Sequence, residues 1–169
     1  GGGAKLAAKL GHKIVPLRPS LVPLESDYPY VDDLQGLSLR NVQGTLTADG
    51  EKIGSEFGEM LFTHFGVSGP IILSLSNLAA KALDEGKEVE LHRLLAALKN
   101  FCVPITSTRP LAEAIVTAGG VSVKEINPKT MESKLIRGLH FAGEVMDVDG
   151  YTGGYNLQAA FSSGHAAGM

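Results

Sequence analysis

The residues with the clearest capacity for chemistry lie near the C-terminus, in GLHFAGEVMDVDGYTGGYNLQAAFSSGHAAG, residues 138–168. A short apolar stretch, Leu139–Ala142, runs into Gly143-Glu144. A carboxylate at a strand end can accept hydrogen bonds from ligand hydroxyl groups. Two adjacent glycines further on precede a helix rich in small residues, whose start offers free N–H groups and a positive dipole end. This order favours binding of a polar, partly anionic ligand. The alternative is an ordinary strand–loop–helix, because glycine-rich turns are common.

Other chemistries find less support in the residue types. Five histidines and one cysteine show no C-x-x-C or H-x-x-x-H spacing, so no metal site is expected. Asp147 and Asp149 fit a solvated loop better than a metal pair. His64 and Ser68 fit a strand end and a helix cap better than a nucleophilic pair, since no G-x-S-x-G motif occurs. Cys102 fits a packed thiol with a raised pKa in an apolar strand. No catalytic residue is assigned.

Composition bounds the class of protein. The 169 residues are 44% hydrophobic and 20% charged, which is typical of a globular chain. A net charge of −3 and a pI of about 5.9 argue against a nucleic-acid partner. The single cysteine cannot form an internal disulfide, which fits a reducing compartment. No apolar window reaches the length of a membrane span, and no signal-peptide core is present. We therefore expect a cytoplasmic protein with no membrane partner.

The first half of the chain must position these residues mainly through strands. Alternating apolar residues and a strong hairpin signal at Asp49-Gly50 indicate antiparallel sheet. The expected elements are a helix at residues 4–10 and strands at 12–17, 34–46 and 57–64.

The second half mixes helices and strands. Gly69-Pro70 opens a helix that extends to about Leu83. A strand at Lys87–Leu91 is followed directly by a helical pattern at His92–Asn100, with no turn between them. We interpret the Leu91/His92 junction as an excision or a gap. Further strands are expected at residues 101–106, 121–126 and 139–142.

Long segments of the chain carry a family resemblance. VTAGGVSVKEINPKTMESKLIRGLHFAGEVMDVDGYTGGYNLQAAFSSGHAAG, residues 116–168, resembles the C-terminal part of the aminoacetone oxidase-like flavoproteins. Bile-acid-inducible dehydrogenases and many FAD-dependent oxidoreductases belong to this family. GHKIVPLRPSLVPL, LQGLSLRNV and GEMLFTHFGVSGPIILSLS, which begin at Gly11, Leu34 and Gly58, resemble the substrate-side domain of the family.

The resemblance implies an organisation for the chain. The family combines a Rossmann-like FAD domain, a β-rich substrate domain and a helical insert. The N-terminal strand–GxGxxG–helix unit that holds the FAD pyrophosphate is absent from this sequence. We therefore expect a fragment of α+β class that lacks this unit and the helical insert. Residues 1–91 would form an antiparallel substrate-side domain with one helix near 69–83. Residues 92–169 would hold the end of the insert and the C-terminal part of the FAD-binding domain.

The resemblance also implies roles for individual residues. Gly143 and Glu144 match the position expected to bind ribityl hydroxyls. Gly153, Gly154, Tyr155, Asn156 and Leu157 match the helix start expected beside the flavin pyrimidine edge. Gly119, Gly120 and Val121 match a loop expected to pass near the cofactor.

By resemblance, the parent protein is an FAD-dependent oxidoreductase. Hydride would pass at flavin N5 to or from a small amine or an activated carbon. The fragment alone is expected to be inactive, and its partner is expected to be a small-molecule substrate. One alternative is an RNA-modifying flavoprotein, which the acidic balance disfavours. The other is a non-catalytic folded fragment or interaction module.

Overall fold

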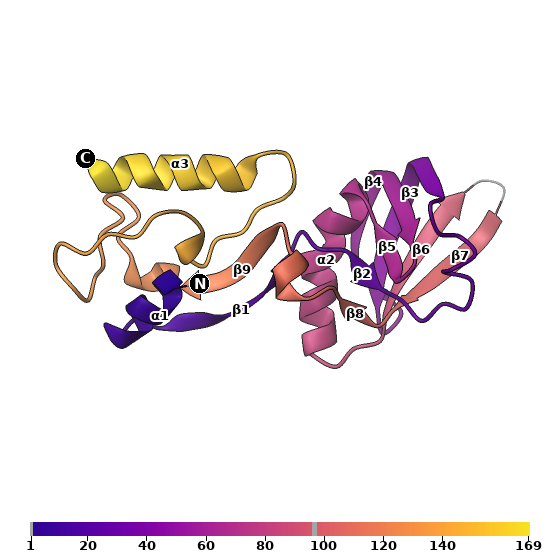
Figure 1. Cartoon of the computed structure of the whole chain (residues 1–169), viewed down its shortest axis with the longest axis horizontal. Helices are drawn as coiled ribbons and strands as arrows, with labels where there is room; N and C mark the ends of the chain where they lie inside the picture. Colours follow the sequence, from indigo (N-terminus) through magenta and orange to yellow (C-terminus); the bar gives the residue numbers. More distant parts are fainter. Residues whose placement is uncertain (1, 96–97) are drawn as a thin grey trace. The chain divides into compact units, whose positions relative to one another are not determined.

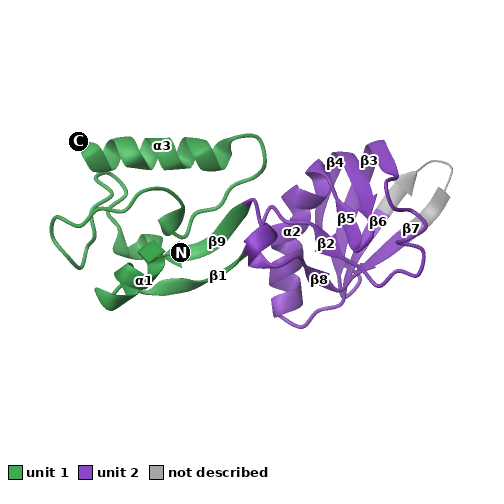
Figure 2. Ribbon diagram, viewed as in Figure 1, with its two compact units in different colours: residues 1–18, 116–169 green, residues 19–115 purple. Residues whose placement is uncertain are grey.

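The computed structural model describes residues 2–95 and 98–169, which fold into two compact units of mixed helix and antiparallel sheet (Figure 1). Unit 1 combines residues 1–18 with residues 116–169, and unit 2 is the continuous segment 19–115 (Figure 2). The expected α+β class is confirmed. This division differs from the expected boundary at residue 91. The chain leaves unit 1 after residue 18, forms all of unit 2 and returns to unit 1 at residue 116.

Unit 2 is built on a 7-stranded sheet in which β6 and β4 flank β3. The strand order is β7-β6-β3-β4-β5-β2-β8, and the neighbouring strands pair antiparallel. The strands are β2 (Leu24–Glu25), β3 (Ser38–Ala48), β4 (Glu51–Thr63), β5 (Gly66–Ser68), β6 (Val89–Leu95), β7 (Leu98–Ile105) and β8 (Ser107–Thr108). A single-turn helix, η1 (Leu111–Glu113), follows β8.

The turn expected at Asp49-Gly50 is confirmed. It joins β3 to β4, and both residues have a positive φ, 51° at Asp49 and 79° at Gly50. Two positive φ angles in a two-residue loop match the right-handed twist of the flanking strands. The side chain of Asp49 also accepts a hydrogen bond from the Glu88 N–H at 2.9 Å. The turn therefore anchors the loop that leads into β6.

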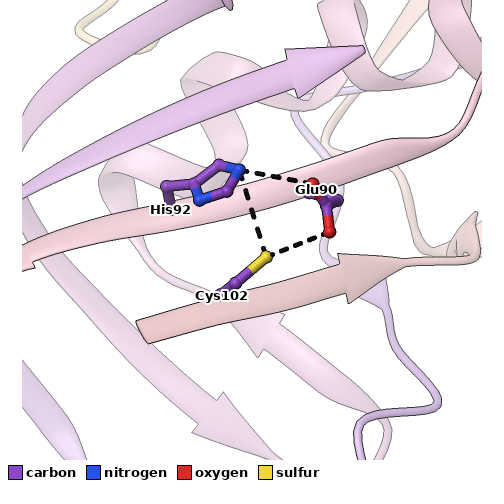
Figure 3. A group of neighbouring side chains, drawn as sticks. All are labelled: Glu90, His92 and Cys102. Carbon is purple, nitrogen blue, oxygen red and sulfur yellow. Dashed lines mark hydrogen bonds and ion pairs between the residues drawn. The ribbon is translucent and has the colours of Figure 1, made fainter. Parts of the chain in front are cut away.

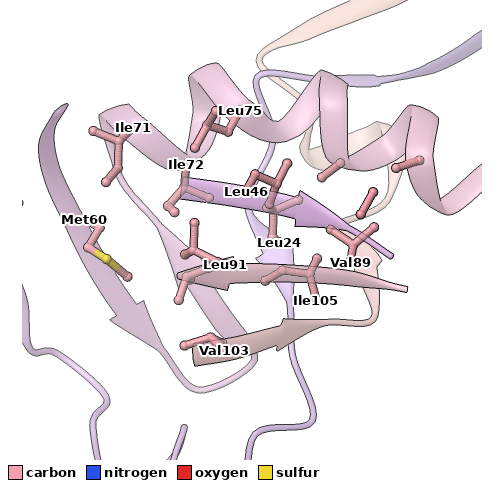
Figure 4. Close-up of a cluster of buried hydrophobic side chains, with 14 of the residues drawn as sticks. Leu24, Leu46, Met60, Ile71, Ile72, Leu75, Val89, Leu91, Val103 and Ile105 are labelled. Atoms are coloured by element: carbon pink, nitrogen blue, oxygen red, sulfur yellow. The ribbon is translucent and has the colours of Figure 1, made fainter. Parts of the chain in front are cut away.

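Helix α2 (Pro70–Asp84) covers one face of this sheet and confirms the helix expected near residues 69–83. Its apolar side chains pack on buried strand residues such as Leu46 and Leu91 to form the core of unit 2 (Figure 4). Close approach is possible because Gly54 on β4 has no side chain. A Cβ atom there would lie 2.7 Å from Leu78 Cδ1 and 2.9 Å from Leu75 Cδ2.

The helix expected at residues 92–100 is wrong. Residues 89–95 form β6, which pairs with β3 from Ala48 to Gln43, and β7 returns beside it. Residues 96–97 lie outside the described part of the chain. Ladder hydrogen bonds on both sides of β6 override the helical propensity of HRLLAALKN, since propensity is a weak local preference. The Leu91/His92 junction consequently lies inside a strand.

Unit 1 is smaller and has its own core. Its elements are α1 (Gly2–Lys9), β1 (Ile14–Ser20, which continues into unit 2), β9 (Val116–Val121), η2 (Val123–Glu125), η3 (Gly143–Val145) and α3 (Tyr155–Gly168). Strands β1 and β9 pair in a two-stranded sheet. Ala7, Val121, Ile126, Phe141 and Met146 form the buried cluster. In the described residues, no helix is long and apolar enough to cross a membrane.

Two strands expected in unit 1 are not formed as such. The segment expected at 121–126 leaves the sheet after Val121 and turns into η2, where the Glu125 N–H bonds to the Ser122 carbonyl at 3.0 Å. The segment expected at 139–142 has one bridge, between Glu132 and His140. A strand requires a neighbour along its length, and this segment has only that single bridge within the described residues.

Candidate functional site

The three residues expected in a loop near the cofactor lie at the end of β9, where the backbone is tightly packed. Gly119 has φ +87°, and a Cβ atom there would lie 2.3 Å from the Pro16 carbonyl oxygen. A Cβ atom on Gly120 would lie 2.5 Å from the Val145 carbonyl oxygen. Val121 is fully buried and bridges to Met146. Packing within unit 1 is therefore sufficient to require both glycines, with or without a ligand nearby.

Gly143 and Glu144 form the start of η3 beside β9. The Glu144 side chain is exposed, and its Oε1 accepts a hydrogen bond from the Thr117 N–H at 3.2 Å. The Gly143 N–H donates to Ser163 Oγ at 3.0 Å, which fixes η3 to α3. The carboxylate thus connects the first turn of η3 to the beginning of β9, and it has a second oxygen with which to accept from a ligand hydroxyl.

The start of α3 carries the remaining expected residues. Gly154 caps the helix in the left-handed conformation, with φ +92° and no side-chain capping bond. The first helical hydrogen bond runs from the Gln158 N–H to the Gly154 carbonyl at 2.9 Å. The N–H groups of Tyr155–Leu157 have no partner within the helix, as at any helix start. Among the described residues, nothing lies within 4 Å of a Cβ atom built on Gly154, so the cap has open space.

The loop before α3 is held by Asn156. Its Oδ1 accepts from the Gly150 N–H at 2.7 Å, and its Nδ2 donates to the Gly150 carbonyl at 2.9 Å. Tyr155 and Leu157 are 65% and 64% exposed. Asn156 therefore has a structural role in closing the loop, while its two neighbours present their side chains to the surface.

The structure brings the expected residues together in two groups. The end of β9 and η3 are in contact, and η3 touches α3 at Ala160 and Ser163. Ala160 lies five residues after Tyr155, or roughly 7 Å along the axis at 1.5 Å per residue. The start of α3 is thus offset from Glu144 by more than one turn of helix. A ligand that contacts both groups must span this offset.

Two pockets are lined by residues other than the expected cofactor residues. In unit 1, a pocket of about 380 Å³ is mainly apolar, and none of the expected cofactor residues lines it. Its walls include Ile126, Met131, Met146, Ala159 and Ala166. In unit 2, a pocket of about 270 Å³ is lined by Ser26, Asp27, Tyr28, Pro29, Val31, Asp32 and His64. Pocket volumes near 300 Å³ are at the lower end for small-molecule sites.

Glu90, His92 and Cys102 form a cluster in unit 2 that was not expected from the sequence (Figure 3). The Cys102 Sγ donates to Glu90 Oε1 at 3.2 Å and lies 4.0 Å from His92 Nε2. His92 Nε2 is 3.4 Å from Glu90 Oε2. The signal was available in the spacing of Glu90 and His92, which puts both on one face of a strand. It was hidden because the segment that begins at His92 was interpreted as a helix.

The environment of Cys102 is only partly as expected. Burial and the hydrogen bond to Glu90 raise the pKa of the thiol to about 11, which confirms the expected direction. Its strand neighbours Val103 and Ile105 are in the core, but Cys102 is half-buried on the opposite, polar face of the sheet. In this apolar run, Val103 and Ile105 face the core, whereas the Cys102 side chain lies on the other face of the strand.

Curated relatives with assigned activities cover nearly the whole chain. The ribosomal RNA dihydrouridine synthase of Escherichia coli (strain K12) is 31% identical over 220 residues, covering 97% of this chain and 54% of that protein. The Haemophilus influenzae enzyme of the same name is 30% identical, covering 99% and 55%. The 3-dehydro-bile acid delta(4,6)-reductase of Clostridium scindens is 27% identical, covering 99% and 57%.

Two facts follow from these alignments. The chain spans about half the length of the curated relatives it matches. The alignments, at 220 to 235 residues, are also longer than the 169 residues of the chain, so the relatives carry residues within the matched region that this chain lacks.

The expectation that nucleic acid is excluded as a partner is wrong. Relatives that match 97% and 99% of the chain are named for an activity on ribosomal RNA. The error came from reasoning on net charge, because a total of −3 says nothing about where positive side chains gather on a surface. The net charge was also counted over a chain that spans only about half the length of these relatives.

One protein-family model matches the chain over its whole length. The model of the HI0933-like protein Rossmann domain covers residues 1–169. This match agrees with the resemblance to flavoproteins noted from the sequence. The chain belongs to the HI0933-like family of Rossmann-domain proteins.

Proposed function

We propose that this chain is part of an FAD-dependent reductase that saturates a carbon–carbon double bond conjugated with a carbonyl group. A dihydrouridine synthase adds hydrogen across a double bond of uracil, which is conjugated with a ring carbonyl. A delta(4,6)-reductase acting on a 3-dehydro bile acid works on double bonds conjugated with the 3-keto group. The two named activities of the relatives therefore share one class of reaction. This class replaces the amine substrate considered from the sequence.

Several residues of the chain fit an FAD molecule. The exposed Glu144 carboxylate can accept from ribityl hydroxyls while Oε1 keeps its bond to Thr117. The start of α3, with its glycine cap and open space, can place backbone N–H groups and a positive dipole end near negative charge. Bound FAD would supply the hydride chemistry, and these residues would bind and orient it.

Uridine in ribosomal RNA is the substrate we propose first. The observation that carries this choice is 31% identity to a ribosomal RNA dihydrouridine synthase over 97% of the chain. A second relative of the same name, from another organism, supports it at 30% identity. The bile-acid reductase, at 27% identity, makes an unsaturated 3-keto steroid the second candidate.

The experiment uses the full-length protein that contains this chain. Its gene is deleted in the source organism, and dihydrouridine is measured in purified ribosomal RNA by nucleoside mass spectrometry. We expect dihydrouridine in ribosomal RNA to disappear on deletion and to return when the full-length gene is restored. Dihydrouridine in transfer RNA should be unchanged and serves as the internal control.

An unchanged level of dihydrouridine in ribosomal RNA would overturn the RNA substrate. The purified full-length protein is then assayed with an unsaturated 3-keto steroid under reducing conditions. Saturation of the steroid would retain the reaction class with the second substrate. Failure with both substrates, from a protein that binds FAD, would overturn the proposed reductase class.

A further inference from the structure

We propose that Glu90, His92 and Cys102 form a binding site for a divalent d-block cation, first of all Zn²⁺, on the polar face of the β6–β7 hairpin (Figure 3). The site lies in unit 2, and the proposal does not depend on the flavin chemistry proposed above. Thiolate, imidazole and carboxylate are the three ligand types from which protein zinc sites are built.

The register of the sheet forces the three side chains onto one face. Glu90 and His92 are two residues apart on β6, so they point to the same side. Cys102 on β7 is the direct antiparallel partner of His92, and such partners have Cβ atoms about 5 Å apart. Leu91 and Val103 alternate with them and are buried in the core on the other side. The cluster therefore follows from strand pairing and not from a flexible loop.

The distances between the ligand atoms already approach those of a zinc site. Metal bonds of about 2.0–2.3 Å in a tetrahedron place ligand atoms about 3.4–3.6 Å apart. Here Nε2 of His92 is 3.4 Å from Oε2 of Glu90, and Sγ of Cys102 is 3.2 Å from Oε1 of Glu90. Sγ and Nε2 are 4.0 Å apart. The two short distances involve different oxygens of Glu90; with one ligand atom taken from each residue, the three atoms lie within 4.8 Å of one another. Rotation of these side chains would close the arrangement around a cation.

Thr47 on the neighbouring strand supports the cluster from one side. Its Oγ1 lies 3.1 Å from His92 Nε2 and 3.4 Å from the Glu90 carbonyl oxygen. The hydroxyl is largely buried and holds the imidazole edge toward Glu90 and Cys102. When Nε2 binds the cation, the hydroxyl keeps the Glu90 carbonyl as its acceptor. The contact between Thr47 and Nε2 is replaced by the metal bond, and Thr47 then closes one side of the site by packing.

Charge and ligand type select the cation. On binding the cation, the Cys102 thiol releases its proton to solvent, and the resulting thiolate and the Glu90 carboxylate together balance the charge of a divalent ion. Sulfur and nitrogen ligands favour Zn²⁺ over Mg²⁺ and Ca²⁺, which prefer all-oxygen sites. The side chains of His92 and Glu90 are 37% and 38% exposed, so water can reach the fourth position. Three protein ligands with one solvent position is the arrangement of an open zinc site.

The test uses the full 169-residue chain, freed of metal with a chelator and kept reduced. Zn²⁺ affinity is measured by competition with a chromophoric chelator, and Co²⁺ is used as a spectroscopic probe. We expect one Zn²⁺ per chain and a thiolate-to-cobalt charge-transfer band. Loss of a residue that only supports a metal ligand weakens metal binding by about 10–100-fold. Cys102→Ser and His92→Gln each remove a ligand itself, so each should weaken Zn²⁺ binding by at least about 100-fold. Excess Mg²⁺ should not compete.

Glu88→Gln and His64→Gln are the matched controls, because both residues are exposed and lie outside the cluster. They should bind Zn²⁺ like the wild type. Cys102 is the only cysteine in the chain, so alkylation offers a readout that needs no variant. Zn²⁺ should slow labelling of Cys102 at least tenfold, and Mg²⁺ should not. Equal Zn²⁺ affinity in wild type and Cys102→Ser, or labelling that Zn²⁺ does not slow, would overturn the proposal.

Discussion

His12 connects separate segments of unit 1 through both nitrogens of its ring. Nδ1 lies 2.9 Å from Glu125 Oε2, and Nε2 lies 2.8 Å from Ser133 Oγ. The ring also meets the edge of Phe141, with centroids 4.8 Å apart. The Glu125 carboxylate further accepts from the Lys13 N–H. One buried side chain thus joins the start of β1 to η2 and to the loop that follows.

Replacing His12 by alanine should destabilise unit 1 by about 3 kcal/mol. The change leaves the Ser133 hydroxyl and the Glu125 carboxylate without their shared partner and opens a cavity beside Phe141. Urea unfolding followed by circular dichroism measures the effect. His140→Ala is the matched control, because His140 is exposed and should change stability by less than about 1 kcal/mol. Equal effects of the two changes would contradict this role.

Replacing Glu144 by alanine should weaken FAD binding to the full-length protein by about 1–3 kcal/mol, the range for a hydrogen bond that involves a charged group. The prediction rests on the proposed contact between this exposed carboxylate and ribityl hydroxyls. Titration of FAD into apoprotein measures it. Glu51→Ala removes an exposed carboxylate of unit 2 and should leave the dissociation constant unchanged. Identical constants for wild type and Glu144→Ala would assign Glu144 a purely local role.

At the scale of elements, the pairing of β1 with β9 depends on a glycine. Gly119→Ala should destabilise the chain strongly, by about 3 kcal/mol or more, because the new Cβ would lie 2.3 Å from the Pro16 carbonyl at a positive φ. Gly138→Ala is the control. Gly138 also has a positive φ, +78°, but among the described residues nothing lies within 4 Å of its Cβ position. The difference between the two melting temperatures isolates the clash, and its absence would refute the close approach.

The edge of the unit 2 sheet is held by Glu25 on β2. Its carboxylate accepts from the Ser107 hydroxyl and from Arg109 Nη1, the latter at 2.6 Å, and these bonds lower the pKa of Glu25. Arg109 also bonds to Glu113 and lies over the Phe65 ring, 4.5 Å from its centroid. This group ties β2 to β8 and to the segment that follows β8.

Stability should therefore depend on the ionisation of Glu25. A folded-state pKa below the ordinary value of 4.5 means that the stabilisation is present above that pH and is lost as the pH falls below it. Glu25→Gln should cost about 1 kcal/mol at pH 7, and the difference from wild type should shrink below pH 4.5. Urea unfolding at several pH values checks this. Glu59→Gln, which breaks an exposed pair with Arg40, should show little change at any pH.

Elements with strong local signals could be predicted from the sequence. The Asp49-Gly50 turn and the helix opened by Pro70 are specified by residues within the element, and both are present. The segment from His92 could not be read correctly, since its strand is stabilised by β3 and β7, which lie far away in the sequence. The same long-range pairing adds Cys102 to the cluster. The spacing of Glu90 and His92 in the sequence indicates two of its members, and the third follows only from the pairing of β6 with β7.

The candidate cofactor residues show the same limit. By resemblance, Gly119 and Gly120 are expected in a loop near the cofactor, and this stays a prediction. In the structure, carbonyl oxygens of Pro16 and Val145 lie within 2.5 Å of the positions that their Cβ atoms would take. The expected helix after Gly153-Gly154 is present, and Gly154 is its N-cap residue. How Glu144 and the start of α3 are arranged around a ligand stays a prediction.

At the scale of the whole molecule, unit 2 should fold alone. Its core residues all lie between Leu24 and Ile105, inside the continuous segment 19–115. A protein of residues 19–115 should show cooperative thermal unfolding and the β-rich circular dichroism of unit 2, because it retains its complete core. A disordered spectrum for this segment would contradict the division into units. Unit 1 consists of two separate segments, residues 1–18 and 116–169. It therefore cannot be produced as one uninterrupted piece of the chain for the same unfolding experiment.

The two ends of unit 2 meet. The Ile115 N–H bonds to the Leu21 carbonyl at 3.4 Å, and the Arg109 N–H bonds to the Pro23 carbonyl at 3.0 Å. A segment whose ends are adjacent can be inserted into a host protein, or exchanged for another, with little change to the host backbone. At the level of genes, one recombination event could then replace the whole module between β1 and β9. Members of such a lineage would differ in unit 2 while inheriting unit 1 unaltered.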